Sequence, residues 1–300
     1  DIDYSQADTY FVAASTDEKM FQVVTDDRDT HAVHASQVFG IPYEEVLAHK
    51  GDKHSARKLV KPISHGGNYF MTARTMYARL LTEIGTTGLQ QMAERLGLPK
   101  PKLTKDFIKL CEIALHRYRA QYPKLLHWHY TLYGEQTANQ GLISTAFGFT
   151  TWFPIKMDKE KVDGVLRQIA AYKGQGGTAG LMNRFLVNTY FEGRSQEFDS
   201  MEYPEYGKLM HEALMAGDFI PVVQVHDSIV FFIRETKLQL LDIVMKQMMA
   251  PINYNGHKFH VPVECEVGRF WSKRLMSSYK LGDFENFDLN KLHKLEERTL

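Results

Sequence analysis

The sequence has few cysteines and no excess of charge of either sign. Its two cysteines, Cys111 and Cys265, are far apart and in no ligand-like spacing. This argues against a disulfide framework or a cysteine-type zinc site, and it suits a reducing compartment. The 36 Lys and Arg residues equal the 36 Asp and Glu residues in number, so a basic coat over the whole protein is absent, although a local basic face for nucleic acid remains open.

Long apolar runs and a leader pattern are missing as well. No stretch approaches the ~20 residues that a membrane-spanning helix needs, and residues 1–10 show no signal-peptide pattern. We therefore expect a soluble intracellular protein without a membrane partner. Hydrophobic residues make up 44% of the 300, which is enough to bury a core in one large domain or two ordinary ones.

Apolar patterns predict strands near both ends of the chain with helices between them. This order is typical of an α+β fold with a helical insertion between two sheet-forming parts. Residues 1–14 start as a strand and run into a polar turn, and residues 258–271 alternate as a further strand. The other predicted elements are a helix at 29–40 from an Asp N-cap to Gly40, a mostly helical region at 53–133 broken at 96–103, a hairpin or a strand with bends at 144–155, a helix at 161–194 around a glycine cluster, and an amphipathic helix at 235–249.

The run VVQVHDSIVFF (222–232) predicts a buried strand pair with a tight turn at His226, Asp227 and Ser228. A carboxylate among so many apolar neighbours is costly unless its charge is paired. Asp is also common in turns, because its side chain bonds nearby backbone amides. For the pair His226 and Asp227 taken alone, the simpler interpretation is that the Asp side chain caps the turn.

Two other stretches favour a chemical role. In DYSQAD, Asp3 ends a strand and Asp8 lies one turn further on. In RKLVKPISHGGNY, Arg57, Lys61 and His65 recur every four residues along one helical face. Carboxylates from separate strands match the oxygen preference of Mg²⁺, and a cationic stripe suits the phosphates of a nucleotide, although each stretch alone is a weak signal.

Together these stretches resemble a known family. DYSQ, then an Arg-x3-Lys-x3-aromatic-x3-Tyr helix, then QVHD are similar to motifs A, B and C of the A-family (polymerase I-like) DNA polymerases, in the same order. Further similar segments are DRDTHAVHASQVFG, RYRAQYP, RQIAAYKGQGGTA and VPVECEVGRFW, so the resemblance covers nearly the whole chain.

The resemblance implies a right-hand polymerase fold and a template-directed DNA polymerase, a nucleotidyltransferase. Residues 1–25 and 161–300 would form the palm, an antiparallel sheet with helices, and residues 26–160 would form helical fingers. The family normally has a thumb, and usually an exonuclease domain, before motif A. We expect both to be absent from this chain and supplied by an upstream portion on the same or another chain. The implied partners are primer-template DNA and dNTPs, in the cytoplasm of a bacterial or phage-infected cell or in an organelle.

Position by position, the resemblance also implies a two-metal site. Asp3 and Asp227, with the backbone carbonyl of Tyr4, would hold two Mg²⁺ ions, for which Mn²⁺ could substitute. Lys61 would be a candidate proton donor to the pyrophosphate. The other implied contacts are Arg57, Lys61 and His31 on the triphosphate, Tyr4, Gln6, Asp8, His65 and Tyr69 around the nucleotide and the templating base, and Arg167, Gln175 and His226 on the DNA.

Five positions depart from the family pattern. His65 stands where the family usually has Phe or Tyr, and Pro62 in the same helix costs ~3 kcal/mol or more unless the helix kinks. Ser228 replaces the acid that usually follows the motif C Asp, and Asp8 replaces the Glu that usually screens the 2′-position of the sugar. Gly177 is an extra glycine after the Arg-x7-Gln match. The metal carboxylates are untouched, and the departures bear on sugar discrimination.

Two alternative functions stay open. A single-subunit RNA polymerase, or a ribonucleotide-tolerant enzyme, shares the palm, and HDS resembles the motif C of that family. The SQ pair after Asp3 and the acid at position 8 are instead similar to the DNA enzymes. The second alternative is a catalytically inactive, nucleic-acid-binding remnant, which would have no chemical need for both carboxylates and for the pair Arg57 and Lys61.

Overall fold

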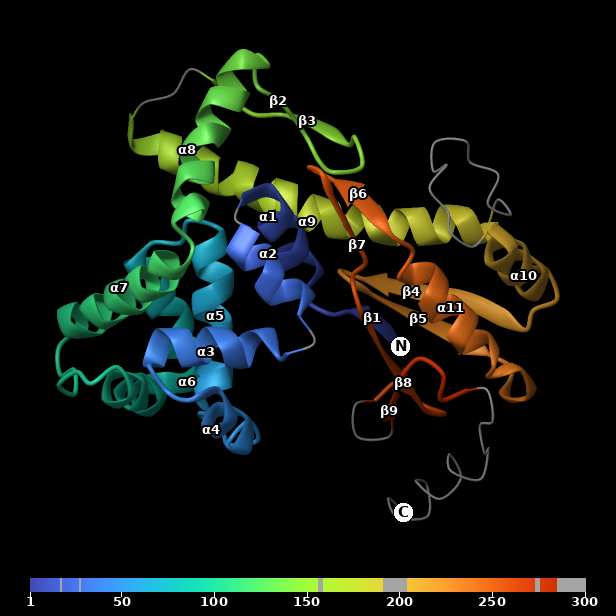
Figure 1. Cartoon of the computed structure of the whole chain (residues 1–300), viewed down its shortest axis with the longest axis horizontal. Helices are drawn as coiled ribbons and strands as arrows, with labels where there is room; N and C mark the ends of the chain where they lie inside the picture. Colours follow the sequence, from blue (N-terminus) through green and yellow to red (C-terminus); the bar gives the residue numbers. More distant parts are fainter. Residues whose placement is uncertain (17, 27, 156–158, 191–203, 273–275, 285–300) are drawn as a thin grey trace. The chain divides into compact units, whose positions relative to one another are not determined.

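The computed structural model divides the chain into two compact units (Figure 1). Residues 1–8 and 175–300 form the first unit, and residues 9–174 form the second. The structure describes all residues except 17, 27, 156–158, 191–203, 273–275 and 285–300, and it describes no side chain at 159–161, 190 and 204–207.

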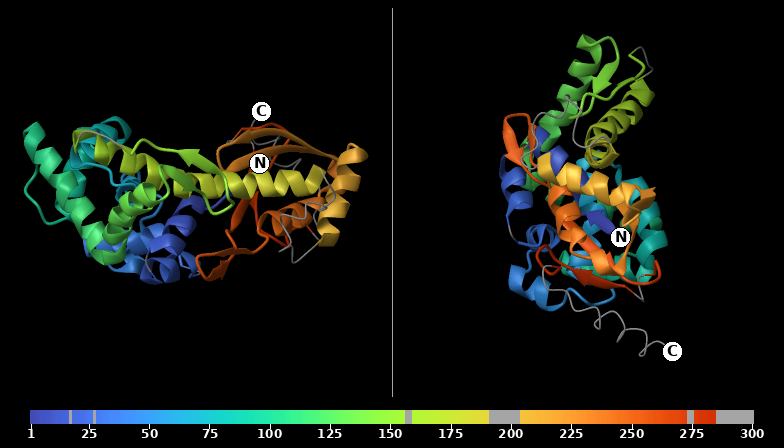
Figure 2. Two further views of the ribbon diagram at one scale, coloured as in Figure 1. Left: turned by 90° about the horizontal axis from the view of Figure 1, so that it is seen from above. Right: turned by 90° about the vertical axis from the view of Figure 1, so that its right-hand side faces the viewer.

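The first unit is built on an antiparallel sheet with the strand order β4-β5-β1-β8-β9. The short strand β1 is central, because it pairs with β5 on one side and with β8 on the other. Figure 2 shows the later strands, coloured orange to red, from two further directions. The elements are β1 Ile2–Tyr4, α10 Pro204–Met215, β4 Phe219–Val225, β5 Ser228–Ile233, the 3-10 turn η2 Glu235–Lys237, α11 Leu240–Met248, β6 Ile252–Tyr254, β7 His257–Phe259, β8 Val263–Val267 and β9 Ser277–Tyr279.

The alternation of side chains along β1 decides which face of the sheet is core. Ile2 and Tyr4 are buried, whereas Asp3 between them is exposed on the opposite face. Aromatic rings fill part of the core: the ring centroids of Phe219 and Phe231 lie 4.5 Å apart, and Phe185 meets Phe231 edge-on at 6.0 Å. The sheet therefore has one apolar face and one face that can carry charged groups.

The second unit is mostly helical and is packed around α5. Leu59, Val60 and Ile63 of this helix have no exposed surface. Gly67 lies under the ring of Tyr118, where any side chain would collide with it. The elements are α1 Ala7–Thr16, α2 Glu18–Thr25, α3 Thr30–Phe39, α4 Tyr43–Ala48, α5 Ala56–Asn68, α6 Ala73–Arg95, α7 Thr104–Gln121, α8 Pro123–Ala138, β2 Leu142–Ser144, β3 Thr150–Trp152 and α9 Lys159–Tyr190, of which α1 starts in the first unit and α9 ends in it.

The predicted α+β class is confirmed, and so are most of the predicted elements. Helix α3 lies between an Asp29 N-cap and Gly40, whose φ of +70° ends it. The hairpin β2–β3 and the helical region around the glycine cluster are also present, although residues 191–194 lie outside the described residues. Both cysteines are buried and free. No described helix is both long and apolar enough to cross a bilayer.

Three local predictions were wrong. Residues 258–271 are not one strand: Pro262, which has no N–H group, lies between β7 and β8. The second error concerns where two helices begin: α1 already begins at Ala7, which leaves a short turn after β1, and α11 begins at Leu240 rather than at residue 235. The third error concerns burial.

Strand β4 was expected to be buried, but its second half is exposed. Val222, Val223 and Val225 expose 45%, 39% and 39% of their surface. The reason is the position of β4 at the edge of the sheet, where only β5 pairs with it. An apolar run alone does not distinguish a central strand from an edge strand.

Candidate functional site

The backbones of Asp3 and Asp227 are neighbours in the first unit. Residues His226 and Asp227 form the two-residue turn between β4 and β5, which Val225 and Ser228 close as a pair. His226 has a φ of +55°, the left-handed conformation that such turns need and that Gly or Asn adopts more easily. The predicted tight turn is therefore confirmed, and it fixes where the Asp227 side chain leaves the backbone.

The register of β1 places Asp3 beside this turn. Asp3 lies opposite Ser228, and the amide of Tyr4 donates a 2.9 Å hydrogen bond to the carbonyl of Asp227. Asp3 is exposed and Asp227 is half-buried. Backbone pairing thus brings Asp3 on β1 next to the turn that carries Asp227, although the two residues are far apart in the sequence.

The donor chemistry of this pair fits a divalent metal. In proteins Mg²⁺ is usually bound by one or two carboxylates together with substrate phosphates and water, rather than by a complete protein cage. Two carboxylates on one sheet meet that need. Within the described part of the chain no three His, Cys, Asp or Glu side chains gather as a metal cluster, so the donor set is a sparse one.

The buried side of β1 holds the site in place. The Tyr4 hydroxyl donates a 2.7 Å hydrogen bond to the carbonyl of Met248 at the end of α11. The Arg184 guanidinium donates to the carbonyls of Ala250 and Pro251 at 2.6 and 3.1 Å. Burial raises the pKa of Tyr4 and lowers that of Arg184. The strand that carries Asp3 is therefore tied to α9 and to the segment after α11.

Glu264 is an acidic neighbour that sequence reasoning missed. It lies directly opposite Asp3 on β8 and is exposed. Residues that face each other across antiparallel strands project from the same face of the sheet. The alternation in Val263–Val267 already showed that Glu264 would be polar and outward, but its partner could not be read from the sequence.

The predicted cations lie in the second unit, on α5. Arg57, Lys61 and His65 follow each other at intervals of four residues in this helix, as predicted. Ser55 caps its first turn by accepting a hydrogen bond from the Lys58 amide.

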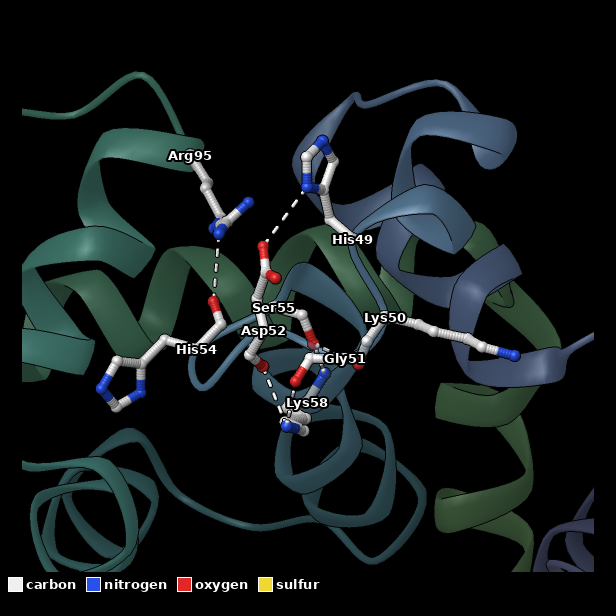
Figure 3. A network of polar contacts seen from close by, with 8 residues as sticks. All are labelled: His49, Lys50, Gly51, Asp52, His54, Ser55, Lys58 and Arg95. Carbon is white, nitrogen blue, oxygen red and sulfur yellow. Dashed lines mark hydrogen bonds and ion pairs between the residues drawn. The ribbon is translucent and has the colours of Figure 1, made fainter.

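Two basic side chains hold the loop before α5 by donating hydrogen bonds to its backbone carbonyls (Figure 3). The Lys58 ammonium donates to the carbonyls of Gly51 and Asp52 at 3.1 and 2.9 Å, and Arg95 donates to the carbonyl of His54 at 3.0 Å. A cavity of about 520 Å³ beside this loop is lined by charged residues of both signs and by none of the predicted site residues. The loop therefore serves to hold the start of α5.

Arg57 and His31 share a neighbour, Asp29. The Arg57 Nε donates to one Asp29 carboxylate oxygen at 2.7 Å, while the other oxygen caps α3 by accepting from the Ala32 amide at 2.9 Å. Burial, followed by the positive charges of Lys61 and Arg57, lowers the pKa of His31 to about 4. His31 is therefore neutral near pH 7.

The far end of α5 is packed rather than open. Tyr69 is buried and touches Gly174 of α9, where a β-carbon would collide with its hydroxyl. The His65 ring meets the Tyr69 ring edge-on, with centroids 5.0 Å apart. The structure thus places His65 and Tyr69 together, and their roles beside sugar, base and template stay predictions.

The remaining predicted residues are spread over α1, α9 and the turn before α1. Gln6 has a backbone φ of +57°. Its side-chain amide oxygen, Oε1, is buried and has no hydrogen-bond partner among the described residues. Asp8 is half-buried in the first turn of α1. Arg167 is half-buried and Gln175 is exposed, about two turns apart on α9.

A comparison with known sequences identifies the family of the chain. A sequence model described as DNA polymerase family A matches residues 1–273. The chain belongs to this family. It is 25% identical over 274 residues to "DNA polymerase I" of Pseudomonas aeruginosa and 24% identical to "DNA polymerase I, thermostable" of Thermus aquaticus. These matches cover 90% and 89% of this chain but only 24% and 26% of the relatives, so the chain spans about a quarter of their length.

The fold agrees with that of a solved family member. The structure titled "POL domain of Pol1 from M. smegmatis complex with DNA primer-template and dNTP" matches with a TM-score of 0.59 and 18% identity. The match covers 87% of this chain and 38% of that one. At 18% identity this similarity shows that the two proteins share a fold. It does not assign a chemical role to any residue of this chain.

Proposed function

We propose that this chain carries the catalytic part of a template-directed DNA polymerase, which adds dNTPs to a primer 3′-hydroxyl and releases pyrophosphate by a two-metal mechanism. The observation that carries the proposal is the sheet register. Asp3 lies opposite Ser228, and the amide of Tyr4 bonds to the carbonyl of Asp227, so one motif carboxylate lies on β1 and the other in the turn that leads into the neighbouring strand β5. Residues 1–25 and 161–300 are proposed as palm and residues 26–160 as fingers.

Asp3 and Asp227, with the carbonyl oxygen of Tyr4, would hold two Mg²⁺ ions, or Mn²⁺ in their place. When bound, such ions neutralise phosphate charge and lower the pKa of an attacking hydroxyl. The chain contributes rigidity: the hairpin turn and the buried Tyr4 side chain fix the backbone that carries both carboxylates before any ligand arrives.

The triphosphate would be bound by the residues of α5 and the start of α3. Arg57 presents a planar fork suited to phosphate oxygens, and Lys61 adds a point charge that can also donate a proton to the leaving pyrophosphate. His31, which is neutral near pH 7, would donate a hydrogen bond rather than a charge. Gln6, Asp8, His65 and Tyr69 are proposed to surround the rest of the nucleotide.

The DNA would be contacted by His226, Arg167 and Gln175. His226 precedes the motif C carboxylate in the same turn, which suits contact with the primer end. Arg167 and Gln175 suit the minor groove, whose hydrogen-bond acceptors barely change with sequence. Because the chain spans only about a quarter of the length of these relatives, we propose that a thumb and an exonuclease portion come from an upstream portion on the same or another chain.

One observation favours a second candidate function. Ser228, rather than an acid, follows Asp227 and pairs with Asp3, and this HDS sequence resembles motif C of single-subunit RNA polymerases. Ribonucleotide incorporation is therefore the competing activity, and its substrate would be an NTP.

Primer extension by the full-length protein with Mg²⁺ tests the proposal, with dNTPs and NTPs in separate and competing reactions. We expect dNTP-dependent extension that Asp3→Asn abolishes and Asp163→Asn, at an exposed position of α9, leaves intact. Extension with NTPs alone would favour the RNA polymerase function. Tight DNA binding without extension by any nucleotide would identify an inactive binding protein.

A further inference from the structure

We propose that Asp29 is a positioning residue for triphosphate binding: it holds the Arg57 guanidinium by its Nε and so presents the two terminal amino groups to phosphate. The inference rests on the proposed function, because it gives Arg57 its ligand. Asp29 is not one of the residues proposed above to contact the nucleotide itself.

Hydrogen bonds fix both the side chain and the backbone of Asp29. One carboxylate oxygen accepts from the Ala32 amide at 2.9 Å, and the other accepts from Arg57 Nε at 2.7 Å. The Asp29 amide donates to the Tyr43 hydroxyl at 3.1 Å. Burial opposes the charged carboxylate, but the hydrogen bonds from Ala32 and Arg57 outweigh it and hold the pKa of Asp29 below its usual value. Asp29 is therefore a fixed, ionised anchor.

The way Arg57 is held leaves its phosphate-binding edge available. A guanidinium has five N–H donors, and Asp29 takes only the one on Nε. The two terminal amino groups make no hydrogen bond within the described residues. Parallel N–H groups of this kind bind two phosphate oxygens at once, which requires the plane of the fork to be set beforehand.

The same carboxylate also sets the place of His31. Asp29 is the N-cap of α3, and His31 lies in the first turn of that helix. Because His31 is neutral, it adds no positive charge to that of Arg57 and Lys61. Asp29 thus acts on both groups: one carboxylate oxygen caps the helix that carries His31, and the other binds Arg57.

A neighbouring ion pair provides a matched control. Arg28 Nε lies 2.7 Å from Asp26 Oδ2, the same distance as in the Arg57–Asp29 pair. The Arg28 and Asp26 side chains expose 53% and 38% of their surface, against 26% and 25% for Arg57 and Asp29. An exposed pair of this kind contributes little to stability.

The experiment measures the dissociation constant of the incoming dNTP and the rate of single-turnover incorporation in the full-length protein bound to primer-template. Asp29→Asn and Asp29→Ser both keep a side-chain oxygen that can cap α3 but remove the charge that holds Arg57. We expect each to weaken dNTP binding on the order of tenfold, below the ~10²-fold that a 1 Å misplacement can cost. The melting temperature should stay near that of the parent, and Asp26→Asn should bind dNTP normally.

A double-mutant cycle separates positioning from a general structural effect. In an Arg57→Ala background, Asp29→Asn should cause no further loss of dNTP affinity, because the group that it positions is gone. An equal loss in both backgrounds, or normal dNTP affinity in both Asp29 variants while Arg57→Ala binds weakly, would overturn the inference and leave the proposed function standing. Normal dNTP affinity in Arg57→Ala would instead overturn the proposed triphosphate site itself.

Discussion

The backbone amide of Tyr4 donates a hydrogen bond to the backbone carbonyl of Asp227. This bond joins the end of β1 to the turn of the β4–β5 hairpin, so the separation of Asp3 and Asp227 depends on main-chain geometry rather than on side-chain contacts. A metal site built in this way should tolerate isosteric changes of its carboxylates without losing the fold.

Asp227→Asn and Asp3→Asn should therefore lose metal binding while remaining folded. We expect each variant to reduce Mn²⁺ affinity, measured from the free Mn²⁺ signal in electron paramagnetic resonance, and to slow extension by at least ~10²-fold. DNA binding and melting temperature should stay close to those of the parent. Unchanged Mn²⁺ affinity in both variants would place the metal elsewhere.

Asp8 should control the choice between deoxyribose and ribose. It lies half-buried in the first turn of α1, and it is one methylene shorter than the Glu usual in the family. Pocket shape alone discriminates an added hydroxyl only on the order of 10²-fold. Asp8→Glu should raise the ratio of dNTP to NTP incorporation and Asp8→Ala should lower it, as measured by competition on one primer-template. Equal ratios in all three proteins would remove Asp8 from this role.

Gly174 should be needed for the packing of Tyr69. A β-carbon at Gly174 would collide with the Tyr69 hydroxyl, so Gly174→Ala should lower stability by ~1–3 kcal/mol, as overpacking usually does. Adding Tyr69→Phe, which removes the nearest atom, should recover part of the loss in thermal unfolding. Gly164→Ala on the same helix has room for its methyl group and should stabilise the protein slightly. A stable Gly174→Ala variant would contradict the placement of Tyr69.

His34 should make the stability depend on pH below neutrality. Its ring Nδ1 lies 3.1 Å from the Ser64 hydroxyl, whose hydrogen is donated to the carbonyl of Val60, so His34 must be the donor and its buried Nε2 carries the lone pair. Burial lowers the pKa of His34 to about 3.

Protonation of the His34 ring favours the unfolded chain, because the buried ring in the folded chain binds the proton more weakly. The unfolded chain takes up a proton near pH 6.5 and the folded chain only near pH 3, so stability falls as pH drops through this window. Between pH 7 and pH 5 the free energy of unfolding should fall by about 2 kcal/mol from this residue. His34→Gln should flatten that part of the profile in chemical denaturation, whereas His127→Gln, at an exposed position, should not. Parallel profiles for the parent and His34→Gln would exclude the assignment.

Local signals in the sequence predicted most of the elements, and contacts between distant segments could not be predicted. The cap at Asp29 and the stop at Gly40 depend on neighbouring residues only, and both are as predicted. The pairing of Asp3 with Ser228 and Glu264 joins segments more than 200 residues apart, and no local pattern contains that register. The hydrogen bond between Arg57 and Asp29 also joins two separate helices, 28 residues apart, and no local pattern predicts it. The break between β7 and β8 was readable, because Pro262 cannot continue a strand ladder.

The exposed edge of the first unit is blunted against unwanted strand addition. An open edge strand with apolar side chains invites pairing with other chains. In β4, however, Pro221 offers no amide hydrogen, and the register shifts between Pro221 and Val223. A foreign strand that paired with β4 would therefore lose its regular hydrogen-bond pattern after a few residues. The hairpin whose turn contains Asp227 can thus keep an apolar outer edge and still be a poor template for fibrils.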